Sequence, residues 1–147
     1  MKKALPLLFL LLSSVFAVGQ TTTQFTNTGS GPCVNPNYPR NYYCAAMKRY
    51  ENGVWVGYLA FFFVLNADGE TFQNGTYSVA DTNDATIFSA QNFSGTFNGK
   101  TVNGTFSTST VIGSTSQAMG LIKWCSGRYG CYYREADLGG SGTYTTK

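Results

Sequence analysis

From residue 42 onward, apolar and polar residues alternate in short runs that are separated by turn-forming residues. Alternation with a period of two is typical of strands with one buried face. The pattern predicts eight strands, over Tyr42–Glu51, Val54–Asn66, Glu70–Ala80, Thr86–Phe97, Lys100–Ile112, Gln117–Cys125, Cys131–Glu135 and Gly142–Thr146. We therefore expect an all-β fold, an antiparallel meander of about eight short strands that forms a small barrel or a sandwich. A short helix over Cys44–Arg49 is the alternative for the first strand.

Asn-Gly pairs, which favour two-residue hairpin turns, separate several of these runs. They occur at Asn52-Gly53, Asn74-Gly75, Asn98-Gly99 and Asn103-Gly104. With Asn98-Gly99 as a turn, Phe97 pairs with Lys100 and Gly95 pairs with Val102, so Asn103-Gly104 falls within a strand. One face of this hairpin is then apolar and is predicted to face the core: Phe93, Phe97, Val102 and Phe106. The other face is polar: Asn92, Ser94, Thr96, Thr101, Asn103 and Thr105.

The segment Val54–Leu65 is apolar at almost every position. This composition predicts a central strand that is buried on both faces. In the alternative interpretation, one apolar face meets a ligand or another subunit.

The start of the chain has the features of a signal peptide. Lys2 and Lys3 precede the apolar run 4–16, and small residues at 17 and 19 fit a cleavage site before Gln20. A cut after Ala17 is the alternative. The run is too short to span a membrane, which takes about 20 apolar residues. We predict a signal peptide over 1–19, an N-terminal extended segment over 20–31 and a single β domain over 32–147, in a protein that is secreted to the extracellular space or the cell surface.

The four cysteines, Cys33, Cys44, Cys125 and Cys131, are an even set in an exported chain, which predicts two disulfides. The local pairing, Cys33 with Cys44 and Cys125 with Cys131, closes the shortest loops and costs the least entropy. A pairing between the N-terminal segment and the late hairpin is left open. The spacings do not resemble a zinc ribbon, and the chain has no histidine, so we predict no metal site.

Three alternative structures are predicted for the polar, β-branched stretch that follows Gln20. It could be a tail, an edge strand, or a strand that pairs outside its own domain. In an extended segment, Thr21, Thr23, Phe25 and Asn27 project to one side. Added to the sheet edge of a neighbouring subunit, this face would build an assembly.

The absence of histidine reduces the number of catalytic mechanisms that the sequence allows. Without histidine, the usual Ser-His-Asp, Cys-His and histidine acid–base systems are excluded. Three carboxylate pairs remain for a glycoside hydrolase: Asp68 with Glu70, Asp81 with Asp84, and Glu135 with Asp137. The first two pairs are also ordinary turn chemistry. We therefore predict no enzyme, no catalytic residue and no cofactor.

Charge argues against nucleic acid as a partner. Removal of Lys2 and Lys3 leaves 8 of the 10 basic residues against 7 acidic ones, without a clustered basic face. Three sequons mark candidate glycosylation sites at Asn74, Asn92 and Asn103, of which the last two are predicted to be near neighbours on the polar face. Aromatic residues suited to a binding surface are Trp55, Tyr129, Tyr132 and Tyr133.

These observations predict a secreted, non-enzymatic protein that acts by binding or self-assembly. We expect an extracellular structural, filament or surface subunit joined by N-terminal strand addition. The partners would be copies of itself, another extracellular protein or a glycan. The alternative is a β-barrel that binds an apolar small molecule, similar in outline to lipocalin-like and avidin-like barrels. A carboxylate-dependent glycoside hydrolase is the third hypothesis.

Overall fold

The computed structural model describes residues 20–32, 42–126 and 130–147, with side chains described outside 29–32 and 120–138. These residues form eight strands and no helix. The strands are β1 (Thr22–Pro32), β2 (Tyr42–Glu51), β3 (Val54–Val64), β4 (Thr71–Ala80), β5 (Thr86–Phe97), β6 (Thr101–Ser107), β7 (Val111–Ser126) and β8 (Gly130–Thr146). The helix alternative for Cys44–Arg49 is wrong, since this stretch lies within β2.

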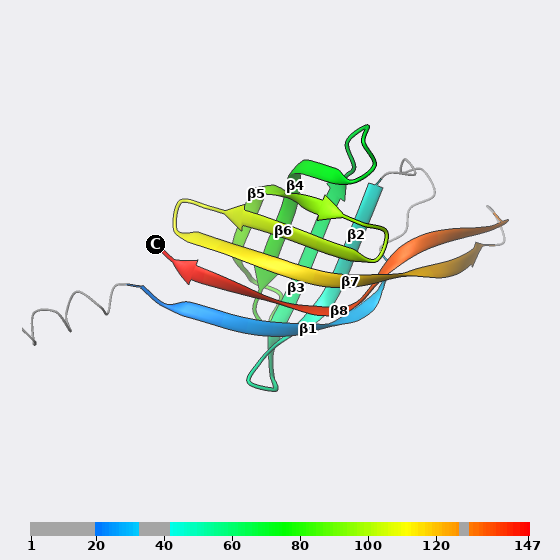
Figure 1. The fold of residues 1–147 in the computed structure, drawn as a ribbon. Coiled ribbons are helices and arrows are strands. Elements are labelled where there is room, and N and C mark those ends of the chain that lie inside the picture. Colours follow the sequence, from blue (N-terminus) through cyan, green and yellow to red (C-terminus); the bar gives the residue numbers. More distant parts are fainter. Residues whose placement is uncertain (1–19, 33–41, 127–129) are drawn as a thin grey trace, which may run out of the picture.

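The strands form a closed barrel in which each one is antiparallel to the next along the chain. β1 closes the barrel by pairing with β8, where Thr23 lies opposite Tyr144. Figure 1 shows β6, β7, β8 and β1 side by side along one side of this barrel. The predicted all-β antiparallel meander is therefore confirmed, in its barrel form.

β1 corrects the prediction that residues 20–31 are a segment apart from the domain. Its residues pair with β8 through one backbone edge and with β2 through the other. Phe25 and Asn27 are buried inside the barrel, because strand alternation turns every second residue of β1 inward. The N-terminal strand β1 is thus part of the barrel of its own chain.

Strand boundaries differ from the prediction at the end of the chain. The predicted strand Lys100–Ile112 ends at Ser107, where Thr108 and Val111 close a turn through the bond from Thr108 N to Val111 O, 2.7 Å. The predicted strands Cys131–Glu135 and Gly142–Thr146 are one continuous strand, β8. The glycine-rich stretch between them favours a loop by composition, but β8 continues through it, with an irregularity in its pairing to β7 opposite Ala118 and Met119.

The β5–β6 hairpin has the predicted faces but a different register. Phe93, Phe97, Val102 and Phe106 are all buried, as predicted. Phe97 pairs with Val102 and Gly95 with Gly104, so the register is shifted by two residues and each side chain keeps its face. The cause is Asn98, whose Oδ1 accepts hydrogen bonds from the N–H groups of Lys100 and Thr101 at 2.9 and 2.7 Å and widens the turn.

Aromatic rings fill much of the barrel core. The Phe63 and Phe72 rings stack with centroids 4.0 Å apart, and those of Tyr77 and Phe106 stack at 4.1 Å. β3 contributes Leu59, Phe61 and Phe63 to this core, whereas Phe62 and Val64 on its outer face are 40% and 43% exposed. The prediction of a strand buried on both faces is therefore wrong, because a barrel strand has a single core face.

Candidate binding groove

A groove of about 830 Å³ crosses the outer face of the barrel over β5, β6, β7, β8 and β1, and ends against the β2–β3 turn. On β1, β6, β7 and β8, its outward side-chain lining comes from residues two positions apart, such as Ser114 and Ser116 on β7. Such pairs point outward together, because side chains alternate between the faces of a strand.

Strand register joins these side chains into two rows that run across the barrel, here called the first and the second ladder. Members of a ladder lie directly opposite one another on neighbouring strands, which are about 4.8 Å apart. The first ladder is Ser94, Thr105, Ser114, Thr143 and Gln24. The second ladder is Asn103, Ser116, Ser141, Thr26 and Tyr50.

The ladder side chains are available for a ligand. Ser94 Oγ donates to the carbonyl oxygen of Asn92 at 2.8 Å, and the other ladder side chains make no hydrogen bond among the described residues. Most are exposed and the rest are half-buried. The groove lining contains hydroxyl and amide groups and one phenol, and none of its residues is charged.

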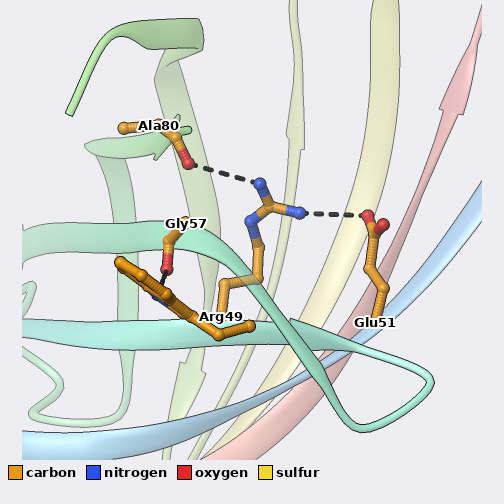
Figure 2. A network of polar contacts seen from close by, with 5 residues as sticks. Arg49, Glu51, Gly57 and Ala80 are labelled. Carbon is orange, nitrogen blue, oxygen red and sulfur yellow. Dashed lines mark hydrogen bonds and ion pairs between the residues drawn. The ribbon is translucent and has the colours of Figure 1, made fainter. Parts of the chain in front are cut away.

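The β2–β3 hairpin forms the wall of the groove at the Tyr50 end. Its tip is the predicted Asn52-Gly53 turn, in which both residues have positive φ, 50° and 78°. Figure 2 shows the Arg49 side chain between the carboxylate of Glu51 and the carbonyl of Ala80, with distances of 3.1 and 3.3 Å. These contacts tie the base of the hairpin to the end of β4.

Trp55 lies on this hairpin but outside the groove lining. Its Nε1 donates to the carbonyl of Gly57 at 2.9 Å, and its exposed ring lies 5.5 Å from Nζ of Lys48 in a cation–π contact. Of the other predicted binding aromatics, Tyr129 lies outside the described residues. Tyr132 and Tyr133 lie on β8, where their side chains are outside the described part.

The predicted assembly face points into the barrel. Thr23, Phe25 and Asn27 share one side of β1 as predicted, and that side faces the core of the same chain. Thr21 precedes the strand, and its carbonyl accepts a hydrogen bond from the N–H of Thr146 at 2.9 Å. The alternate residues Gln24 and Thr26, which sequence reasoning did not single out, line the groove. Their signal in the sequence is the polar half of the β1 alternation.

The three sequon asparagines occupy different environments. Asn103 is exposed in the groove, and Asn74 is exposed on β4 with φ of 59°. Asn92 bridges β5 to Ser107, donating from Nδ2 to Oγ and accepting the backbone N–H, both at 2.9 Å. Asn103 lies opposite Thr96, four residues along β6 from Ser107, so the two asparagines share the outer face but are not adjacent.

The carboxylates of Asp68 and Asp81 organise turns. Asp68 accepts backbone N–H bonds from Glu70 and Thr71 at 2.8 and 2.9 Å, and Asp81 accepts those of Asn83 and Ala85, both at 2.9 Å. Glu135 and Asp137 have side chains outside the described part. Among the described residues, no group of three or more metal-ligating His, Cys, Asp or Glu side chains occurs.

Cys44 is buried on β2, and the side chains of Cys33, Cys125 and Cys131 lie outside the described part of the chain. The two disulfides and their pairing therefore stay predictions.

No family model, curated protein or solved structure matches this chain. The described residues include no helix with the length and apolar character needed to cross a membrane.

Proposed function

We propose that this protein is a secreted, non-enzymatic binding protein, and that the groove across β5–β8 and β1 binds a neutral polysaccharide. The observation that carries the proposal is the pair of ladders, in which ten uncharged polar side chains face one groove. Hydroxyl and amide groups both donate and accept hydrogen bonds, which matches the hydroxyl groups of a sugar chain.

The lack of charged side chains in the groove favours a neutral ligand over an anionic one. An anionic polymer such as nucleic acid is bound mainly through Lys and Arg, and the groove has neither. An extended ligand suits the shape, because the first ladder spans five strands, or about 19 Å at the usual strand spacing. Tyr50, at the end of the second ladder, offers an aromatic face with a polar tip.

The other predicted functions gain less support. Assembly through N-terminal strand addition would require β1 to leave its own barrel, because both of its edges are already paired. An apolar ligand inside the barrel would compete with the rings of Phe61, Phe63, Tyr77 and Phe93 for the same interior.

Secretion and two disulfides belong to this proposal. The β7–β8 register places Cys125 directly opposite Cys131, which supports the local pairing of these two residues. Intact-mass analysis of the secreted protein should show loss of the first 19 residues and no free thiol.

The test is affinity electrophoresis and titration calorimetry with neutral and acidic polysaccharides. The double variant Ser114→Ala/Ser116→Ala removes one hydroxyl from each ladder and should weaken binding about tenfold, as expected for two hydrogen bonds of about 0.7 kcal/mol each. The matched control is Ser78→Ala/Ser89→Ala, which removes a hydroxyl pair bonded at 2.9 Å across β4 and β5 outside the groove. Binding of acidic polymers alone, or equal loss in both double variants, would contradict the proposal.

A further inference from the structure

The interior of the barrel contains a row of polar side chains that the groove does not use. On the inward-facing positions, Gln117 lies opposite Gly140, Gly140 lies opposite Asn27, and Asn27 lies opposite Arg49. Gln117, Asn27 and Arg49 are 0%, 4% and 2% exposed. They come from β7, β1 and β2, and Gly140 of β8 lies between β7 and β1 where the barrel closes.

Four buried polar atoms in this row have no hydrogen-bond partner: Asn27 Oδ1, Asn27 Nδ2, Gln117 Oε1 and Arg49 Nε. Leaving a buried polar group unpaired is costly, so such groups normally have a partner. Two of these atoms are donors and two are acceptors.

The neighbours of the row orient these atoms. Gln117 Nε2 donates to Thr115 Oγ1 at 2.7 Å, which fixes the amide and leaves Oε1 as its open atom. A side chain at Gly140 would overlap Oε1 of Gln117, so the amide lies over this glycine, beside β1. Arg49 already binds Glu51 through Nη1 and the Ala80 carbonyl through Nη2, so Nε is its one nitrogen without a hydrogen-bond partner among the described residues (Figure 2).

We infer that Asn27, Arg49 and Gln117 form an internal binding site for a small neutral group that both donates and accepts hydrogen bonds. Water molecules and a primary amide or urea-type group share this chemistry, since each can accept from Nδ2 and Nε and donate to Oδ1 and Oε1. An anion would face the two open acceptor oxygens. A cation would face the guanidinium of Arg49, whose charge Glu51 already balances.

The direction of the change in Tm on substitution of Asn27 distinguishes a site that holds a bound group from a site whose polar atoms have no partner. Asn27→Leu keeps the branched shape and removes both open amide atoms, and Asn27 makes no hydrogen bond with its side chain among the described residues. With a bound group, the substitution breaks hydrogen bonds and should lower Tm by at least about 3 °C. With no bound group, it removes an unsatisfied amide from the core, and an unchanged or higher Tm would overturn the inference. Thr26→Val, an outward substitution next to Asn27, is the control and should leave Tm nearly unchanged.

A high-resolution crystal structure of the wild-type protein, together with native mass spectrometry, gives a second readout that does not require a variant to fold. Density within 2.7–3.2 Å of the four open atoms supports the inference, since this is ordinary hydrogen-bond distance. A single-atom peak without added mass identifies water, and added mass identifies a co-purified molecule. Direct pairing of Asn27 with Gln117, or a bound ion, would overturn it. None of these outcomes depends on polysaccharide binding in the outer groove.

Discussion

Phe25 of β1 lies opposite Gly142 of β8, and its ring occupies the space that a side chain at position 142 would need. The pair sits where the first and last strands meet, so it belongs to the closure of the barrel. It also lies directly beneath the groove, between the two ladders. The Phe25 ring fills the core beneath the backbone of Gly142, which has no side chain. The ladder residues lie on the outer side of the same strands.

Gly142→Ala should destabilise the protein by roughly 1–3 kcal/mol, because the added methyl group overpacks a filled site. The methyl group would also lie close to the Ser114 carbonyl oxygen, at 2.7 Å from the Cβ position, which limits relaxation. Ser141→Ala, on the outward side of the same strand, is the control and should change the free energy of unfolding by less than about 0.5 kcal/mol. Denaturant titration measures both variants, and equal effects would place position 142 outside the core.

Deletion of residues 20–30 should abolish the cooperative melt of the barrel. Without β1, the paired edges of β2 and β8 are exposed, and the core loses Phe25, whose ring lies 6.2 Å from that of Tyr144. Circular dichroism on heating and binding of a hydrophobic dye measure this change. A truncated protein that melts like the full mature chain would show that β1 is dispensable and would return the segment to a role between subunits.

The strand pattern from Tyr42 to Phe97 could be predicted from the sequence, because Asn52-Gly53 and the alternation of inward aromatics are local signals. β1 could not be assigned in this way. Its polar, β-branched residues are equally compatible with a disordered tail, an edge strand or a strand inside the barrel. Only its pairing with β8, more than 110 residues away in the sequence, shows which of these structures it adopts.

The two ladders and the interior polar row were also beyond sequence reasoning, because they depend on cross-strand register. Asn27 and Gln117 are ordinary polar residues in sequence, and only the closed barrel places them opposite Gly140 from the two sides of β8. The register of β5 and β6 was mispredicted by two residues for a related reason: the Asn98 side chain, and not the Asn-Gly pair alone, sets the turn.

Asn92→Ala should lower the free energy of unfolding by about 1 kcal/mol, because it removes two hydrogen bonds to Ser107 at the exposed end of the β5–β6 hairpin, where water can replace them. Asn103→Ala provides the matched control on the neighbouring strand, since its side chain makes no hydrogen bond within the described chain. Denaturant midpoints should therefore differ between the two variants. If Asn103→Ala proves the more destabilising, the Asn92 bridge is not a structural link.

The final prediction concerns pH and the β3–β4 turn. The Thr71 hydroxyl, which donates to Asp68 at 2.6 Å, and the N–H groups of Glu70 and Thr71 hold the pKa of Asp68 below its ordinary value of 3.8. Because the folded pKa lies below the unfolded one, the carboxylate stabilises the folded protein at pH values above the unfolded pKa. This contribution is lost as the pH falls through the folded value.

Asp68→Asn should therefore destabilise the protein at neutral pH, and the difference from the wild type should shrink as the pH falls below 3.8. Urea titrations at a series of pH values from neutral down to about pH 2 measure the two curves, which should converge only at the acidic end. Glu70→Gln is the control, because the Glu70 side chain makes no hydrogen bond among the described residues. A constant difference between Asp68→Asn and the wild type at every pH would show that shape, and not the ionised carboxylate, holds this turn.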